Sequence, residues 1–137
     1  MALKGILDTR FFFAYFSPKS KSQRAWCKSV VDVAGKPDSF LAASTITIAE
    51  LYENMGRLVG KETVRIRVAS AKAKGIVFLP VDESTSTLAG TILLTTPDLP
   101  IADSLIGSTA VLAADSTVFT DDPHFTRIKG IKTRWVE

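Results

Sequence analysis

The chain has 137 residues, and its 17 Lys and Arg residues against 14 Asp and Glu residues give a formal net charge of +3 at pH 7. That charge is too small to indicate by itself a protein that binds nucleic acid. The length suffices for one domain with its own core, so we expect a single domain over residues 1–137. Ser and Thr interrupt the longest apolar stretches, which fall short of the roughly 20 residues of a membrane span, so no membrane segment is expected.

Cys27 is the one cysteine of the chain, so it cannot form an internal disulfide. A chain of this kind suits a reducing compartment. At the amino end, Asp8 and Arg10 interrupt the first apolar run before it reaches the length of a signal-peptide core. We therefore expect a soluble protein of the cytoplasm.

Apolar runs of strand length alternate with patterns of helical spacing along the chain. We expect strands at 3–7, 39–44, 76–81, 116–120 and 132–136. We expect helices at 10–16, 21–34, 48–58, 62–74, 83–95 and 100–112. Pro80 cannot donate to a central ladder, which places the third strand at an edge or near a strand end. The alternation predicts an α/β sandwich with a mainly parallel sheet.

Five acidic residues adjoin the ends of these strands or begin the helices beside them: Asp8, Glu50, Asp103, Asp121 and Asp122. Because the carboxyl ends of parallel strands lie at one edge of a sheet, these side chains can converge there. Each also has a simpler explanation. Asp8 can cap the next helix, and Glu50 can lie on the polar side of its own helix. Asp121 and Asp122 can form a turn before Pro123.

Carboxylates gathered at one point repel one another unless divalent cations neutralise them. An all-oxygen ligand set selects hard ions, which favours Mg²⁺ or Mn²⁺. Zn²⁺ is not expected, because the single His124 and the single Cys27 supply no tetrahedral set. Such a site suits phosphate chemistry, in which the metal activates a water molecule for an in-line displacement. The chain has no Gly-rich phosphate loop, and neither an organic cofactor nor a covalent intermediate is expected.

Gathering four of the 14 acids in one metal site would leave 17 basic residues against 10 acidic ones elsewhere, a surface charge of +7. A surface with that charge attracts phosphate groups. The alternative is that Lys and Arg only solvate the helix faces, which is the usual role of scattered charge.

Four motifs follow one another in order along nearly the whole chain. They are LDT at 7–9, TxxE at 47–50, an Asp within the small-residue segment IADSLI at 101–106, and TxDxxF at 120–125. In this order they resemble the PIN domain nucleases, and among them the small VapC-type ribonuclease toxins of prokaryotic toxin–antitoxin modules. Any one motif is weak, whereas the four together are specific.

The resemblance implies a Rossmann-like three-layer α/β/α sandwich with a central parallel sheet, an acidic pocket for Mg²⁺ or Mn²⁺, and single-stranded RNA as the substrate. Asp8 and Asp103 would be the principal metal ligands, with Glu50 and Asp122 completing the pocket. Thr120 would orient a ligand or a water molecule. Register with the motif favours Asp122 as the fourth acid, with Asp121 as its substitute.

Arg10 departs from the family pattern, in which a small or polar residue usually follows the Asp-Thr pair. It would either bind a substrate phosphate or pair with a pocket acid and weaken metal binding. Glu53, three residues after Glu50, lies roughly on the same helix face and is expected to be solvated.

The resemblance also implies a small antitoxin that blocks the nuclease. The expected helical hairpin at 47–74 carries more apolar residues than one helix face needs. If part of this surface is exposed, it offers a groove for an amphipathic helix and favours a homodimer. The alternative is that all of it packs on the sheet.

Three other functions stay open on the sequence. The first is a PIN-fold RNA-processing nuclease without an antitoxin. The second is a metal-dependent phosphotransfer domain with Asp8 as the acceptor, which is disfavoured because such phosphatases usually show another Asp shortly after the first. The third is a binding module that kept the fold and lost catalytic turnover, which only Arg10 suggests.

Overall fold

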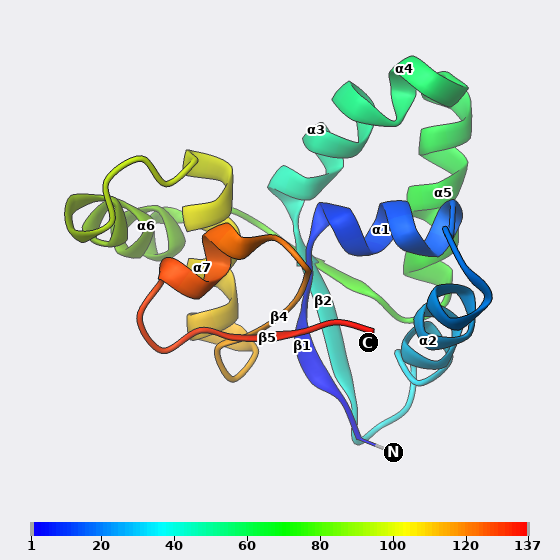
Figure 1. Ribbon diagram of the computed structural model, residues 1–137, viewed down its shortest axis with the longest axis horizontal. Coiled ribbons are helices and arrows are strands. Elements are labelled where there is room, and N and C mark those ends of the chain that lie inside the picture. Colours follow the sequence, from blue (N-terminus) through cyan, green and yellow to red (C-terminus); the bar gives the residue numbers. More distant parts are fainter. Residues whose placement is uncertain (1, 137) are drawn as a thin grey trace.

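A sheet of five parallel strands forms the centre of the computed structural model, which describes residues 2–136 (Figure 1). The strands are β1 (Lys4–Leu7), β2 (Phe40–Ser44), β3 (Val77–Leu79), β4 (Thr117–Phe119) and β5 (Lys132–Arg134). Their spatial order is β3-β2-β1-β4-β5, and every neighbouring pair is parallel. The predicted parallel sheet is confirmed, and β3, which directly precedes Pro80, is an edge strand as expected.

Helices lie between the strands in the order predicted. They are α1 (Thr9–Phe16), α2 (Lys21–Asp32), α3 (Thr45–Asn54), α4 (Gly56–Val59), α5 (Lys61–Ala73), α6 (Glu83–Thr95) and α7 (Ile101–Ala113), followed by the 3₁₀ helix η1 (Pro123–Arg127). Two boundaries differ from expectation: the helix expected at 48–58 is divided before Gly56, a residue of low helix propensity, and Pro100 is the N-cap of α7 rather than part of its first turn. None of the described helices has both the length and the apolar character to cross a membrane.

The alternation of side chains along the strands divides the core into two layers. Leu7 and Leu41 pack with residues of α1, α2, α3 and α5 on one face of the sheet. Ile6 and Ala42, their neighbours in sequence, pack with residues of α6 and α7 on the other face. Burying a Leu or Ile side chain fully stabilises a fold by roughly 1.5–3 kcal/mol, so both layers hold the sheet in place. Figure 1 shows α1, α2 and α5 on one side of the strands and α6 and α7 on the other, which confirms the predicted three-layer sandwich.

The order of the strands reverses around β1, and this reversal positions the site. The chain passes from β1 to β2 on one side, whereas β4 pairs with β1 on the other side. In open α/β sheets, ligands bind beyond the carboxyl ends of the strands at such a reversal. Asp8 directly follows β1 and Thr120 directly follows β4, so both residues lie at this edge.

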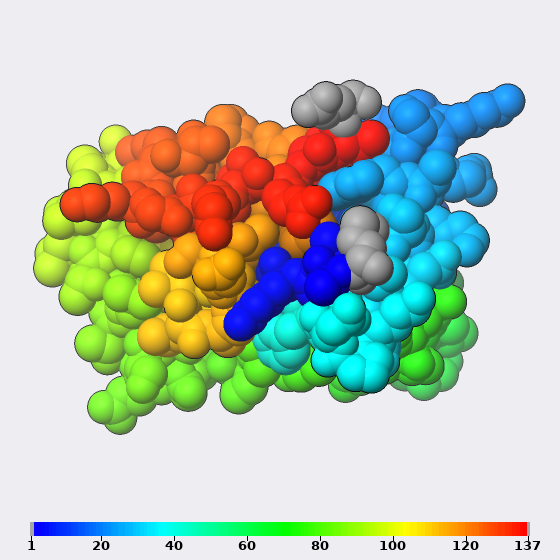
Figure 2. Space-filling model, turned by 90° about the horizontal axis from the view of Figure 1, so that it is seen from below, coloured from blue at the N-terminus to red at the C-terminus, as the bar shows by residue number. Residues whose placement is uncertain are grey.

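The amino ends of the strands lie at the opposite end of the molecule (Figure 2). There the first described residues, in blue, lie between the C-terminal segment in red and the cyan segment that leads into β2. The backbone N–H of Leu3 donates to the Ser39 hydroxyl at 3.0 Å, and the N–H of Phe40 donates to the Leu3 carbonyl at 2.7 Å. These bonds fix the start of β1 against β2 at the end of the sheet that is remote from Asp8.

Candidate active site

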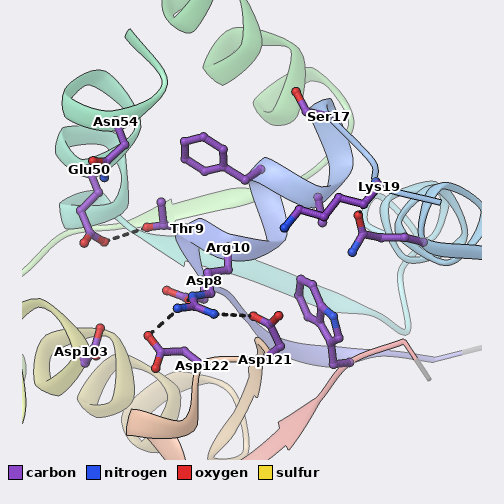
Figure 3. Close-up of a pocket in the computed structure, with 14 residues that line it drawn as sticks. Asp8, Thr9, Arg10, Ser17, Lys19, Glu50, Asn54, Asp103, Asp121 and Asp122 are labelled. Carbon is purple, nitrogen blue, oxygen red and sulfur yellow. Dashed lines mark hydrogen bonds and ion pairs between the residues drawn. The ribbon is translucent and has the colours of Figure 1, made fainter. Parts of the chain in front are cut away.

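Asp8 lies at the carboxyl edge of the sheet and is only 4% exposed (Figure 3). It stands at the N-cap position of α1, but its side chain makes no capping hydrogen bond. Its carboxylate instead accepts a hydrogen bond from the Thr120 hydroxyl at 2.8 Å. Burial raises the pKa of Asp8 from 3.8 to about 6, although the hydrogen bond from Thr120 opposes the shift. Helix capping therefore does not account for this carboxylate.

Thr120 connects the carboxyl ends of the neighbouring strands β1 and β4. Its buried hydroxyl donates to Asp8 and accepts a hydrogen bond from the backbone N–H of Asp122 at 3.0 Å. A hydroxyl can donate and accept at the same time, so a single side chain fixes the carboxylate after β1 and the loop after β4. Thr120 thus holds Asp8 in place.

Asp103 lies in the first turn of α7 and is 8% exposed. Burial is the main cause that raises its pKa from 3.8 to about 6, and the negative charges of Asp122 and Asp8 raise it further. The amino end of a helix partly offsets this cost, because the helix dipole favours negative charge there. The structure therefore holds two buried acids close enough to repel each other.

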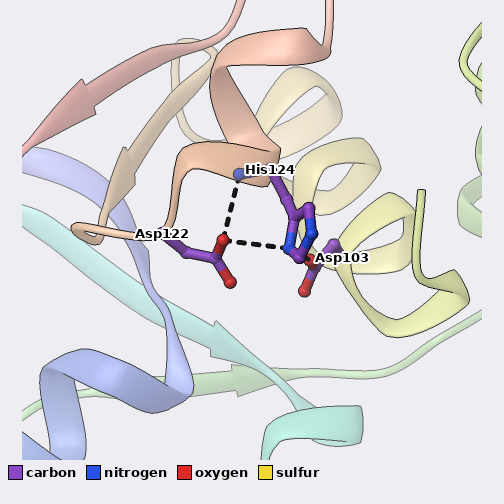
Figure 4. Close-up of side chains that lie close together, drawn as sticks. All are labelled: Asp103, Asp122 and His124. Atoms are coloured by element: carbon purple, nitrogen blue, oxygen red, sulfur yellow. Dashed lines mark hydrogen bonds and ion pairs between the residues drawn. The ribbon is translucent and has the colours of Figure 1, made fainter. Parts of the chain in front are cut away.

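Asp122 and His124 complete a group with Asp103 (Figure 4). The Nδ1 atom of His124 lies 3.0 Å from Oδ1 of Asp122 and 3.1 Å from Oδ2 of Asp103. Asp122 also caps η1, because its Oδ1 accepts a hydrogen bond from the backbone N–H of His124 at 3.0 Å. One ligand atom from each of these three residues lies within 4.8 Å of the others, a spacing that could hold a metal ion.

His124 was missed as a site residue by the sequence reasoning, which considered it only for a tetrahedral zinc site. Its Nδ1 is buried and has no hydrogen-bond partner among residues 2–136, although two carboxylate oxygens lie close to it. A ring nitrogen and two carboxylate oxygens gathered around one point could hold a metal ion between them. The available signal was the spacing of His124 two residues after Asp122, where the turn at Pro123 brings both side chains to the same side.

Glu50 reaches the cavity from α3, which begins directly after β2. Ser44 accepts a hydrogen bond from the N–H of Ile46 at 3.2 Å and starts the helix. The Glu50 carboxylate accepts a hydrogen bond from the Thr9 hydroxyl at 2.7 Å, which connects it to the residue after Asp8. Asp8 and Glu50 line the same cavity as Asp103 and Asp122, but they are not members of the close group with His124.

The doubled acids Asp121 and Asp122 lie in different surroundings. The Asp122 side chain is 13% exposed and turns inward, whereas that of Asp121 is 45% exposed. Arg10 contacts both, with Nη1 at 3.2 Å from Asp121 Oδ1 and Nε at 3.8 Å from Asp122 Oδ2. Of the two roles expected for Arg10, pairing with pocket acids is the one that the structure contains. Glu53 is exposed and lies outside the cavity lining, as expected.

All the predicted site acids border one cavity of about 650 Å³. Figure 3 shows Asp8, Asp103 and Asp122 facing one another, with Glu50 reaching toward Thr9 from its helix. Away from these acids, the cavity extends along α1 toward Ser17 and Lys19. The cavity lining is therefore acidic at one end and polar to basic at the other.

The structure is thus an α/β sandwich with an acidic cavity at the carboxyl edge of its parallel sheet. Residues 5–131 match the PIN domain family, and the chain belongs to this family. Among curated protein sequences, none matches the chain.

Solved structures with the same fold come from bacterial toxin–antitoxin systems. VapBC2 from Rickettsia felis bound to a DNA fragment from its promoter is 17% identical, with a TM-score of 0.73 over 100% of both chains. The Sarcin-Ricin loop cleaving toxin VapC20 from Mycobacterium tuberculosis is 14% identical, with a TM-score of 0.71 over 97% of this chain and 99% of that one. DNA-bound VapBC from Salmonella typhimurium is 24% identical, with a TM-score of 0.69 over 97% and 98%. These similarities establish a fold shared with VapC toxins.

Proposed function

We propose that the protein is a single-domain, metal-dependent endoribonuclease of the cytoplasm that hydrolyses phosphodiester bonds in single-stranded or structured RNA. The observation that carries this proposal is the convergence of four acids, from β1, α3, α7 and the loop after β4, on one cavity: Asp8, Glu50, Asp103 and Asp122. Membership of the PIN domain family supports nuclease chemistry. The overall positive charge of the chain is compatible with an RNA substrate.

A divalent cation fits the group formed by Asp103, Asp122 and His124. The two carboxylates suit Mg²⁺ or Mn²⁺, and an imidazole ligand shifts the preference toward Mn²⁺. When bound, such an ion activates a water molecule and neutralises charge on the phosphate during an in-line displacement. The orphaned Nδ1 of His124 and the raised pKa of Asp103 both support a cation in this position.

The remaining residues hold the acids in position for the reaction. Thr120 fixes the carboxylate of Asp8, and Thr9 fixes that of Glu50. Both hydrogen bonds come from neutral hydroxyls, so they orient the carboxylates without neutralising them. Both carboxylates are thereby oriented toward the cavity, where they would contact a cation or the attacking water.

The test of this function is cleavage of RNA by the purified protein with Mn²⁺ or Mg²⁺ and with EDTA. We expect cleavage only with metal, and its loss in Asp103→Asn. Glu53→Gln is the matched control for Glu50→Gln, because both residues lie on α3 but only Glu50 lines the cavity. Equal cleavage in EDTA, or wild-type activity in Asp103→Asn, would rule out the proposed mechanism.

We further propose that the nuclease is the toxin of a type II toxin–antitoxin module. The hairpin of α3, α4 and α5 buries Leu51 and Met55 but exposes Leu58 and Ile66, so the alternative that all of its apolar surface packs on the sheet was wrong. The exposed part offers an apolar surface for an antitoxin helix. The VapBC complexes with this fold support such a partner.

A homodimer is part of the same proposal. Besides the hairpin, α6 and α7 expose the apolar side chains of Leu94, Ile101 and Leu112, which a second copy of the chain could cover. The measurement is the mass of the purified protein in solution, alone and after co-expression with the product of an adjacent small gene. A partner that binds but leaves RNA cleavage unchanged, or expression alone that never slows growth, would count against the toxin.

A further inference from the structure

The cavity is larger than a metal centre needs. Its volume is about 650 Å³, whereas the ligand atoms of Asp103, Asp122 and His124 lie within 4.8 Å of one another. Cavities of ~300–1,000 Å³ typically hold a whole small molecule. The part that extends away from the acids, here called the aromatic arm, is lined by Phe13, Ser17, Lys19, Gln23 and Trp135.

Trp135 is a rigid aromatic platform in this arm. It follows β5 and is half-buried, so part of its ring lines the cavity. From behind, it packs against Trp26 with ring centroids 5.3 Å apart, and Trp26 stacks on the buried Phe119 at 6.1 Å. This packing fixes the indole before any ligand arrives, which lowers the entropy cost of stacking on it.

Gln23 presents hydrogen-bond donors to the same space. The side-chain oxygen of Gln23 accepts a hydrogen bond from the backbone N–H of Lys19 at 2.8 Å. The backbone N–H of Gln23 donates to the hydroxyl of the N-cap residue Ser20 at 3.0 Å. Because a backbone N–H can only donate, the oxygen of the amide must face it, and the NH₂ group lies on the other side. Among residues 2–136 no partner takes up this NH₂ group, and Gln23 lines the cavity.

The charges of the arm suit an anion. Lys19 is exposed at its wall, whereas Arg10, which lines the same cavity, is paired with Asp121 and Asp122. None of the five residues of the arm is acidic. A basic peptide would find no acidic partner in the arm. The phosphate of a nucleotide would find the positive charge of Lys19 there.

We propose that the aromatic arm binds the nucleobase next to the scissile phosphate of RNA. Trp135 stacks on the base, the NH₂ group of Gln23 donates to an acceptor on its edge, and Lys19 contacts the neighbouring phosphate. The inference rests on the proposed ribonuclease function, to which it adds a determinant of the cleaved sequence. Stacking on an aromatic side chain changes the affinity for a base by about 5- to 150-fold.

The direct test uses fluorescence in Ca²⁺, so that binding can be measured apart from Mn²⁺-dependent turnover. The chain has two tryptophans, and Trp26→Phe leaves Trp135 as the only one while keeping an aromatic ring behind it. Short single-stranded RNA should quench the Trp135 emission. A series of oligonucleotides with one abasic position each should identify a single position whose base is needed for quenching.

A matched set of variants then tests the contact in the full chain. Trp135→Ala should weaken RNA binding about tenfold, and Trp135→Phe should retain most of it. Tyr52→Ala is the control, because Tyr52 is also a partly exposed aromatic residue but lies on α3 outside the cavity lining. Gln23→Ala should weaken binding only to RNA that carries the base at the identified position. Trp135→Ala should be insensitive to the abasic substitution that weakens the wild type.

Equal RNA affinity in wild type and Trp135→Ala, or equal effects of the abasic substitution in both, would overturn the inference. Loss of affinity for a co-expressed protein partner with unchanged RNA affinity would also overturn it, and would assign the arm to a protein interface. These outcomes are distinct from a failure of the proposed function, which would be the absence of metal-dependent cleavage in the wild type.

Discussion

The two ends of the cavity are built in opposite ways. The acidic end is built around two buried side chains from elements far apart in the sequence, Asp8 and Asp103, and the Thr120 hydroxyl holds the first of them. The aromatic arm consists largely of half-buried or exposed side chains, and its residues Lys19 and Gln23 lie within one turn of chain at the start of α2. The centre of the acidic end is thus buried with the core, whereas the arm lies at the surface.

The two ends therefore differ in how much they lower the stability of the folded protein. Burial raises the pKa of Asp8 and Asp103, which means that the folded protein is destabilised when both are ionised. Lys19 and Gln23 at the other end carry no such cost, because neither is a buried acid. We therefore expect substitutions at the acidic end to abolish turnover, and substitutions in the arm to change which RNA is cleaved.

The largest expected effect is on turnover at the acidic end. Asp8→Asn and Asp103→Asn should each lower RNA cleavage by at least about 100-fold, because each removes a charge that the cation needs. Both variants should fold, and the metal-free form of Asp8→Asn should be at least as stable as wild type, since a neutral amide avoids the burial of charge. Cleavage rates and thermal unfolding in EDTA measure the two effects. A loss of activity accompanied by unfolding would mean that these acids serve the fold instead.

The neighbouring acids Asp121 and Asp122 provide a sharper contrast. Asp122→Asn should lower cleavage by roughly 100-fold, whereas Asp121→Asn should change it by only a few-fold, because only Asp122 turns inward to Asp103 and His124. Parallel cleavage assays of the two variants measure this difference. The reverse order of effects would make Asp121 the fourth acid.

The free energy of unfolding should fall as the pH rises, because Asp8 is a buried acid with a raised pKa. The pKa of Asp8 is about 6 in the folded protein and near 3.8 when exposed, so its contribution is favourable below pH 3.8 and is lost as the pH rises through 6. Between pH 5 and pH 7 this loss amounts to about 1 kcal/mol. Urea unfolding in EDTA measures it, with Asp8→Asn as the control that should show a shallower dependence. Identical pH dependence in both proteins would show that Asp8 titrates normally.

Arg10 should have the smallest effect. Its ion pair with Asp121 is about half exposed, so Arg10→Gln should change the free energy of unfolding by less than about 1 kcal/mol. Because the guanidinium also lies near Asp122, its removal should strengthen Mn²⁺ binding by a few-fold. Calorimetric titration distinguishes this result from unchanged metal affinity with weaker RNA binding, which would make Arg10 a phosphate-binding residue.

Much of the fold could be predicted because the local signals agreed with the tertiary ones. The apolar run before Asp8 is a strand, the expected hairpin turns at Gly60 with a positive φ of 84°, and α6 covers the expected residues 83–95. The break before Gly56 was missed, since the apolar spacing continues through it while the backbone does not.

The site could be predicted less completely, because it depends on contacts across the sheet. The positions of Asp8 and Glu50 at one edge follow from strand order, but the role of Thr120 as a bridge is defined only by its two hydrogen bonds. The position of His124 depends on the turn of η1, which brings its Nδ1 to Asp103 on another helix. No pattern of residue types along the chain contains that contact.

The most direct test of the central claim is a calorimetric titration of Mn²⁺ into the metal-free protein at pH 7, with Asp103→Asn measured in parallel. We predict saturable binding in the wild type that is lost or strongly weakened in the variant, together with a rise in the unfolding temperature of the wild type alone. If the wild type bound no metal at millimolar concentration, or if the variant bound it equally well, the buried acids would not form a metal centre.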